Sequence, residues 1–346
     1  MNVAGLAERD WTAPFTVDVR LALSVQGRGR GDPTFRVDEA GTIWRTSLTP
    51  DGPGTIRVLP GRVPEPGDRA TEPVTRVRAQ AWGPGAQWLL DALPDALGAS
   101  DDPSGLAADA HPVIRDAARC HPGLRLGRSG RLMEALVPAV LEQKVVILEA
   151  HRAWRTLLAK YGTTPPGPAP PGMRVFPSPR TWRRIPSWDW HRAGVEGVRA
   201  QTIIRAATVA DSLERLLTLG HEEADRRLRS IPGIGIWTSA EARQRAAGDP
   251  DAVSVGDYHL KNVVGWALAG QERSTDEEML AFLEPFKGHR HRATRLIGLS
   301  RGHGAGAGAV AAAGSGARSG SGIARYGAGG PPRRGPRMPV RDYRNI

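Results

Sequence analysis

Apolar and polar residues alternate along much of the first hundred positions, with the period of two that β-strands have. Every second residue from Phe15 to Val25 is apolar, which predicts a strand with one buried face and one face in water. Apolar residues at helical spacing predict a helix over 86–97, in which Pro94 can end the helix early. Strands followed by a covering helix indicate a small, β-rich α+β domain over residues 1–105. The other predicted strands are 34–38, 42–48, 55–59 and 75–82.

After a polar break at 101–105, the apolar residues recur at the spacing of helices. One long apolar stripe covers 131–161, and Pro138 within it predicts a kink or a helix start. A proline-rich loop occupies 163–171. These patterns predict a mainly α-helical second domain over residues 106–300. The other predicted helices are 179–185, 199–219, 222–230, one on each side of Gly248-Asp249, and 289–299.

The end of the chain differs from the rest in composition. Residues 302–330 are mostly Gly, Ala and Ser, which cannot bury enough surface to offset the entropy of ordering. We therefore expect a Gly/Ala-rich, basic and flexible tail over 301–346. The chain has a net charge of +11, of which eight arginines and one aspartate in this tail supply +7. A basic chain suggests a polyanionic partner such as nucleic acid, but the remaining +4 on residues 1–300 leaves other partners open.

Several classes of protein are excluded or disfavoured. The single cysteine, Cys120, cannot form an internal disulfide, an iron–sulfur cluster or a cysteine zinc site. The histidines also lack the spacing of zinc ligands. No run of eighteen apolar residues is present, and the N-terminus lacks the pattern of a signal peptide. We therefore expect a cytoplasmic protein without a membrane partner.

The most informative stretch runs from Leu228 to Thr238, and it predicts two helices joined by the tight turn Pro-Gly-Ile-Gly. Gly233 and Gly235 permit positive φ angles and carry no side chain that would block a ligand. Backbone N–H groups at the start of the second helix lack intrahelical partners and lie at the positive end of the helix dipole, a geometry that binds phosphate. For Pro-Gly-x-Gly taken alone, an ordinary helical corner is the alternative interpretation.

The longer string Ile-Pro-Gly-Ile-Gly-x-Trp-Thr, with an aspartate about twenty residues further on, resembles the signature of the helix-hairpin-helix DNA glycosylases. The resemblance covers roughly residues 130–300 and is greatest to the DNA-3-methyladenine glycosylase II family. Members of that family also carry a small β-rich domain ahead of the helical one. The resemblance implies a monomer that binds double-stranded DNA with damaged bases, without an organic cofactor. Its DNA contacts would be Gly233, Ile234, Gly235, Thr238 and Lys144.

Asp257, in Gly-Asp-Tyr-His-Leu-Lys, stands where the family has its catalytic carboxylate. Cleavage of an N-glycosidic bond builds positive charge on the sugar, and a nearby carboxylate can stabilise that charge or activate water. The alternative role for Asp257 is that of a helix N-cap, which is compatible with catalysis. Asp249 and Asp251 are weaker candidates because they lie in the preceding loop.

Trp237 occupies the position where relatives that also cleave the DNA strand carry a lysine for Schiff-base formation. This difference predicts base excision without lyase activity. By resemblance, Trp237, Tyr258 and Gln143 belong to the pocket that receives the extruded base, although a tryptophan is also a common core residue. Family hairpins often hold a monovalent cation by backbone carbonyls, which here would be those of Arg229, Ile231 and Ile234.

The sequence departs from the family pattern at three places. Lys144 stands where relatives carry a leucine wedge, and Glu241 stands where they often place an aromatic residue. The last helix, 289–295, is basic and could form a phosphate-binding face. The function that we expect is that of a monofunctional glycosylase for alkylated purines such as 3-methyladenine. A glycosylase for deaminated or oxidised bases and a non-catalytic DNA-damage-binding protein remain the alternatives.

Overall fold

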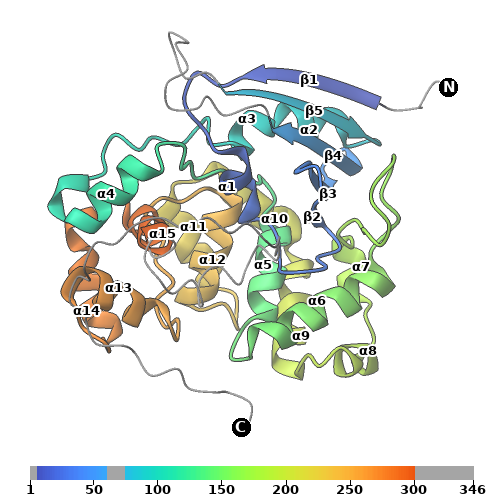
Figure 1. The fold of residues 1–346 in the computed structure, drawn as a ribbon. Coiled ribbons are helices and arrows are strands. Elements are labelled where there is room, and N and C mark those ends of the chain that lie inside the picture. The colour runs from blue at the N-terminus through green and yellow to red at the C-terminus, as the bar shows by residue number, and fades with distance from the viewer. Residues whose placement is uncertain (1–5, 61–74, 301–346) are drawn as a thin grey trace, which may run out of the picture. The chain divides into compact units, whose positions relative to one another are not determined.

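The computed structural model describes residues 6–60 and 75–300, so the predicted tail over 301–346 lies outside the described residues. An antiparallel sheet with the strand order β1-β5-β4-β3-β2 forms the first part of the fold (Figure 1). Four predicted strands are present, each with both ends within three residues of the predicted ones. The strands are β1 (Leu6–Thr12), β2 (Phe35–Val37), β3 (Ile43–Thr49), β4 (Gly52–Pro60) and β5 (Arg76–Trp82).

The predicted strand from Phe15 to Val25 is wrong, because its second half is helix α1 (Val19–Ser24). The Asp18 side chain accepts a hydrogen bond from the backbone N–H of Leu21 at 2.8 Å, which caps this helix. Val19, Ala22 and Leu23 are then buried at helical spacing. The first strand of the sheet is instead β1, which the alternation of the sequence did not reveal.

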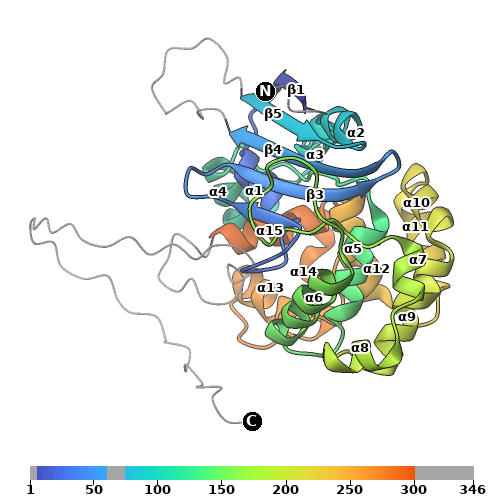
Figure 2. The same ribbon diagram turned by 90° about the vertical axis from the view of Figure 1, so that its right-hand side faces the viewer.

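Two short helices, α2 (Ala86–Asp91) and α3 (Leu93–Ala96), replace the single helix that we expected over 86–97. Pro94 lies in the first turn of α3, where its missing N–H costs no hydrogen bond. Leu89, Leu90 and Leu93 are buried in one apolar core with the sheet residues Ile56 and Val77. The sheet with α2 against it lies above α6, α8, α9, α13 and α14 in Figures 1 and 2.

The second part of the fold is helical over its described length, as predicted. Two further apolar cores hold it together, one around α5, α6, α9 and α12 and the other around α4, α13, α14 and α15. Its helices are α4 (Pro112–Cys120), α5 (Leu132–Leu141), α6 (Ile147–Tyr161), α7 (Pro179–Arg183), α8 (Ser187–Arg192), α9 (Gly197–Thr208), α10 (Ala210–Glu214), α11 (His221–Arg229), α12 (Ile236–Ala246), α13 (Leu260–Ala269), α14 (Asp276–Leu283) and α15 (Arg290–Ser300), with the 3₁₀ helices η1 (Ala108–Ala110), η2 (Arg215–Thr218) and η3 (Glu284–Phe286).

Two glutamates hold the first turn of helix α5 in place. Glu214 on α10 accepts the N–H groups of Leu132 and Met133 at 2.8 and 3.1 Å, which caps the start of α5. Glu134 accepts the N–H of Leu48 on strand β3 at 2.7 Å, which joins α5 to the sheet. Pro138 lies inside α5, and the chain leaves this helix at Glu142. The loop that follows α5 therefore starts from a firmly held position.

In the described part of the chain, no helix is both long and apolar enough to cross a membrane. Cys120 is an exposed free thiol at the end of α4.

Candidate active site

Helices α11 and α12 are joined by the turn over 230–235, as the sequence predicted. Gly233 adopts φ +97°, and a Cβ atom there would lie 2.0 Å from Oγ1 of Thr202 on α9. Only glycine fits this close approach. Gly235 is different, because it has an extended backbone as the N-cap of α12 and faces open space. With no side chain at the N-cap, the first N–H groups of α12 are left to an outside ligand such as a phosphate.

The other predicted hairpin residues have internal roles. Ile234 is buried, and its N–H donates to the carbonyl of Ile231 at 3.0 Å. Thr238 is also buried. The carbonyls proposed for a cation, those of Arg229, Ile231 and Ile234, lie at the end of α11 and in this turn. This cation site stays a prediction.

Gln143 connects the loop after α5 to the hairpin. Its Nε2 donates to the carbonyl oxygen of Gly233 at 2.9 Å and to Oγ1 of Thr238 at 2.7 Å. Both amide protons are thereby used on the two sides of the first turn of α12. Only the side-chain oxygen of Gln143 is left to contact DNA. If Gln143 lies in the base pocket as predicted, this oxygen would form the contact with the base.

Lys144 is exposed at the tip of the same loop and has φ +53°. In the described residues it is the only non-glycine residue with a positive φ angle. Such strain persists only where the surroundings enforce it, and it gathers at functional sites. Arg199 helps to enforce it, because its buried guanidinium donates from Nη1 to the carbonyl of Leu141 at 2.8 Å. Exposed apolar residues follow immediately, with Val146 and Leu148 62% and 72% exposed.

Asp257 lies just ahead of α13. Its Oδ1 accepts the N–H groups of His259 and Leu260, each at 2.8 Å, so its side chain binds the start of α13 although the N-cap residue itself is His259. Its Oδ2 lies 3.4 Å from the indole Nε1 of Trp237, in the first turn of α12. The carboxylate is thus held in one orientation at the positive end of a helix dipole, beside the hairpin. A half-exposed position keeps it accessible to a substrate.

The two aromatic candidates differ in their surroundings. Trp237 is half-buried next to Asp257. Tyr258 is 76% exposed, and its ring contacts His259 edge-on with 4.8 Å between the ring centres. Trp237 is therefore placed to line a site at Asp257, whereas Tyr258 could reach a base only from the solvent side.

A charged cluster lies one turn further along α12. Glu241 accepts hydrogen bonds from Ser254 Oγ at 2.5 Å and from Arg245 Nη1 at 2.7 Å. Burial acts to raise the pKa of Glu241, but Arg245, the Ser254 hydroxyl and Arg28 together hold that pKa below its usual value. Glu241 is therefore an ionised carboxylate.

The sequence interpretation missed two members of this cluster. Arg28 lies between α1 and β2 in the sequence, and its side chain forms an ion pair with Glu142 at 3.3 Å. Glu142 directly precedes Gln143 in the loop after α5. The spacing of Glu241 and Arg245, four residues apart on a helix, was a readable signal for an ion pair. No local sequence pattern predicts the pairing of Arg28 with Glu142, because the two residues are more than a hundred positions apart.

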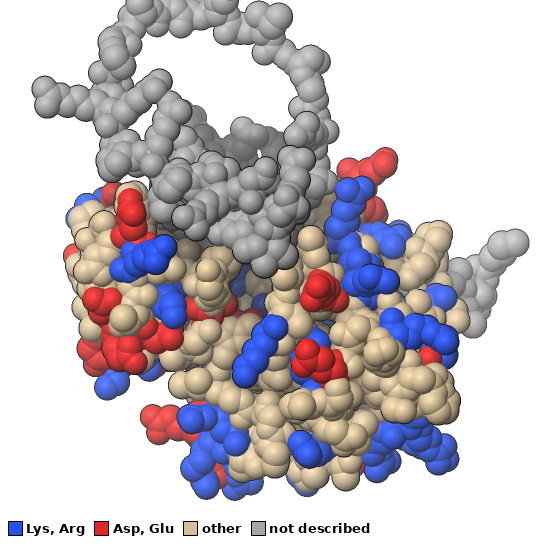
Figure 3. All heavy atoms as spheres, turned by 90° about the horizontal axis from the view of Figure 1, so that it is seen from below, with Lys and Arg blue, Asp and Glu red and all other residues tan. Residues whose placement is uncertain are grey.

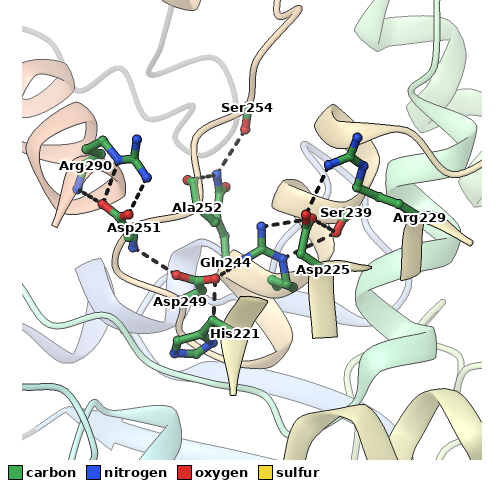
Figure 4. A network of polar contacts seen from close by, with 11 residues as sticks. His221, Asp225, Arg229, Ser239, Gln244, Asp249, Asp251, Ala252, Ser254 and Arg290 are labelled. Carbon is green, nitrogen blue, oxygen red and sulfur yellow. Dashed lines mark hydrogen bonds and ion pairs between the residues drawn. The ribbon is translucent and has the colours of Figure 1, made fainter. Parts of the chain in front are cut away.

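A polar network fixes the loop that leads to Asp257 (Figure 4). Asp225 on α11 accepts from Ser239 Oγ at 2.6 Å and from Arg243 Nη2 at 3.2 Å. Arg243 also pairs with the buried Asp249. The Arg290 side chain on α15 donates to Asp251 at 2.5 and 2.9 Å. Asp249 and Asp251 are thus engaged by arginines, which leaves Asp257 as the best-placed carboxylate.

The basic residues of the last helix point largely inward. His291 and Arg292 are 8% and 2% exposed, and Arg292 pairs with Asp101, whose side chain is 3% exposed. The hypothesis of a phosphate-binding face on α15 is therefore wrong for these residues. A cavity of about 200 Å³ lies between α5, η2, α11 and α12, and no predicted site residue lines it.

Two curated proteins are similar in sequence to about half of this chain. The chain is 31% identical over 176 residues to a probable bifunctional transcriptional activator/DNA repair enzyme AlkA of Mycobacterium tuberculosis (strain CDC 1551 / Oshkosh), covering 50% of this chain and 33% of the relative. It is 25% identical over 191 residues to the DNA-3-methyladenine glycosylase of Bacillus subtilis (strain 168), covering 54% of this chain and 63% of the relative. The chain thus spans less than two thirds of both relatives. No family model matches the sequence.

Solved structures share the fold at low sequence identity. The 3-methyladenine DNA-glycosylase from Archaeoglobus fulgidus aligns with a TM-score of 0.68 at 17% identity, over 85% of this chain and 98% of that one. An 8-oxoguanine glycosylase/lyase of Clostridium acetobutylicum aligns with a TM-score of 0.62 at 12% identity, over 87% of this chain and 100% of that one. The chain thus shares its fold with solved DNA glycosylases, and about half of it is similar in sequence to the two curated relatives.

Proposed function

We propose that the protein is a monofunctional DNA glycosylase that releases alkylated purines, such as 3-methyladenine, from duplex DNA. The observation that carries this proposal is the position of Asp257 beside Trp237 and next to the open N-terminus of α12. One element can hold a phosphate while the other faces the sugar of an extruded nucleotide. The named relatives support a repair glycosylase of this kind.

The chemistry follows from the carboxylate. The C1′–N bond of the damaged nucleotide breaks and both electrons leave with the base. Positive charge then develops on the sugar, and the oriented Oδ2 of Asp257 stabilises it. Water forms the new C1′–O bond, and Asp257 can accept the proton that this water loses. An alkylated, cationic purine departs as a neutral base and needs no strong general acid.

The absence of a lysine at position 237 supports hydrolysis without strand cleavage. A Schiff base requires an amine within reach of C1′. Trp237 instead offers a ring face on which an electron-poor base can stack. The products would be a free base and an abasic site, and the DNA partner would be a duplex with a damaged base.

A second candidate substrate class is favoured by the Glu241 cluster. Deaminated or oxidised purines carry polar edges that a site with Glu241, Ser254 and Arg245 could read. A methyladenine site built only from aromatic rings would not offer such groups. The family's oxidised-base members share the fold alone, so this candidate rests on the cluster.

One assay separates the possibilities. Duplex DNA treated with a methylating agent and duplexes holding a single hypoxanthine or 8-oxoguanine are incubated with the protein, and released bases are identified by mass spectrometry. We expect free 3-methyladenine, with strand breaks only after alkali treatment. Release of the oxidised or deaminated base alone would favour the second class, and binding of damaged DNA without any release would replace both with a damage-binding protein.

A further inference from the structure

Helices α7 and α8 carry a strongly basic outer surface. Its exposed residues, which we call the α7–α8 basic face, are Arg180, Arg183, Arg184, Trp188, His191 and Arg192. Within the described part of the chain, the side chains of Arg180, Arg183 and Arg184 form no hydrogen bond or ion pair. Trp188 is 64% exposed, an uncommon position for so large an apolar ring.

Helices α7 and α8 carry no exposed acidic side chain that could balance the charge of the α7–α8 basic face. Asp189 is the only acidic residue between 179 and 192, and it is buried. Both of its oxygens accept hydrogen bonds from Lys160 at 2.7 Å. The bonds from Lys160 and Tyr161 hold the pKa of Asp189 below its usual value, so this acid is ionised and committed to the interior. Arg192 lies 3.9 Å from an oxygen of Asp189, whereas Arg180, Arg183 and Arg184 pair with no acid among the described residues.

The face is rigid because its helices are joined from beneath. The buried rings of Trp182 on α7 and Trp190 on α8 stack with 5.8 Å between their centres and 25° between their planes. Both helices also pack on α9. Exposed residues three and four positions apart, such as Arg180, Arg183 and Arg184, share the outer side of α7. A ligand would find these groups already positioned.

The face lies near the hairpin along α9. Gly233 abuts Thr202, and Thr202 Oγ1 donates to the carbonyl of Val198 one turn earlier at 3.0 Å. One turn is about 5 Å, and α8 ends five residues before α9 begins. Helices α7 and α8 both contact α9, so the face and the hairpin turn pack against the same helix. Seen from below, Lys and Arg side chains lie along much of the edge of the molecule, including the right-hand side where α8 lies in Figure 1, and some Asp and Glu side chains lie between them (Figure 3).

We propose that the α7–α8 basic face binds the phosphate backbone of the duplex that flanks the hairpin site. The proposal rests on the proposed function for its DNA partner. Guanidinium groups form paired hydrogen bonds with phosphate oxygens, and their binding releases counterions from the DNA. Contacts of this kind carry no base information, so the face adds affinity and residence on DNA without choosing the lesion. Trp188 contributes apolar contact to the deoxyribose edge of the same strand.

The test compares two variants with equal loss of charge. One is Arg180→Gln/Arg183→Gln/Arg184→Gln. Its control is Arg20→Gln/Arg76→Gln/Arg119→Gln, which removes three exposed arginines on α1, β5 and α4. Binding to a duplex with a central abasic-site analogue is measured at several salt concentrations. Each lost phosphate contact lowers the slope of log K against log salt by about 0.9, so we expect a loss of about 2 to 3 for the first variant and no change for the control.

A slope equal to that of the control would overturn the proposal, as would a loss of binding to vesicles of anionic phospholipid without any change in DNA binding. If the triple variant does not fold, Arg183→Gln alone must still lower the slope by about 1. Base release by saturating enzyme serves as the separate readout. Absence of release by the unaltered protein would refute the proposed function, while the salt slope would still decide the role of the face.

Discussion

The indole N–H of Trp237 lies 3.4 Å from Oδ2 of Asp257, while Oδ1 of the same carboxylate accepts two backbone N–H groups of the following helix. The contact with the helix and the catalysis that we propose would thus use different oxygens of one side chain. The backbone bonds fix the plane of the carboxylate, and the indole sets the direction of the second oxygen. A helix cap and a catalytic residue are therefore not competing interpretations of Asp257.

Replacing Trp237 with Phe should keep the ring but remove the N–H. We expect single-turnover base release to fall by up to about tenfold, since one hydrogen bond to a charged group contributes about 1.5 kcal/mol. Binding to an abasic-site duplex should be retained. Trp266→Phe, a partly exposed tryptophan on α13, is the control. An unchanged rate would show that the indole N–H does not orient Asp257.

Replacing Gln143 with Ala should separate the loop after α5 from the hairpin, because both donors to Gly233 and Thr238 are lost. We expect slower base release, because about 1–2 kcal/mol of interaction between the loop and the hairpin is lost. The fluorescence of 2-aminopurine placed beside the lesion, which reports extrusion of the base, should also be weaker. Gln26→Ala removes a comparable bond, to the Arg245 carbonyl, and serves as control.

A double-mutant cycle sharpens this prediction. If Gln143 acts through Thr238, the effects of Gln143→Ala and Thr238→Val should not add, because the second change removes a bond that is already lost. Fully additive effects on base release would show that the two side chains work independently, and the connection between loop and hairpin would then have no kinetic role.

The two hairpin glycines should respond differently to alanine. Gly233→Ala forces a positive φ angle and a clash with Thr202, so we expect a loss of about 2–4 kcal/mol in the free energy of unfolding. Gly235→Ala meets open space in an extended backbone and should change that free energy by less than about 1 kcal/mol. It should still weaken DNA binding, because its methyl group stands at the N-terminus of α12. Urea unfolding and DNA titration check both, and intact binding by the Gly235 variant would refute the phosphate site.

Stability should depend on pH through His291. Burial, and then the charges of Arg295, Arg245 and Arg292, hold the pKa of His291 well below its ordinary value of 6.5. In the unfolded chain the His291 imidazole therefore binds a proton near pH 6.5, whereas in the folded protein it stays neutral at that pH. The stability that the neutral imidazole contributes is present above pH 6.5 and is lost as the pH falls toward the folded pKa, by at most about 1.4 kcal/mol per pH unit.

Unfolding free energies between about pH 7 and pH 5 test this sign. His291→Gln should flatten the decline, whereas replacement of the exposed His191 by Gln is the control. His151, His221 and His289 also have lowered pKa values, so some decline should remain in the variant. A steeper fall in the His291 variant than in the unaltered protein would contradict the account.

Local signals carried the successful parts of the sequence interpretation. The glycine turn before Trp237 and the four later strands depend on residues close together in the chain, where turn chemistry and alternation act directly. Local pattern also misled at residues 15–25, because Asp18 caps a helix inside an alternating stretch. Propensity there yields to a single side-chain hydrogen bond and to packing under the sheet.

The details of the site depend on contacts between distant segments. Arg28 and Glu142 are far apart in sequence, as are Gln143 and Gly233, and their pairings arise only when α5, α12 and the sheet pack together. The basic last helix shows the same limit. Its charges suggested a DNA-facing surface, but Asp101 and Asp251 bind Arg292 and Arg290 from other parts of the chain.

The most direct test of the account is the single-turnover rate of base release from methylated duplex DNA by the protein and by Asp257→Asn. Asparagine keeps an oxygen that can accept the N–H groups of His259 and Leu260, so the fold and DNA binding should be retained. The account predicts that base release falls by about 10²- to 10³-fold or more, because the charge facing the sugar is lost. An unchanged rate in a folded, DNA-binding variant would contradict it and leave Asp257 with the role of a helix cap alone.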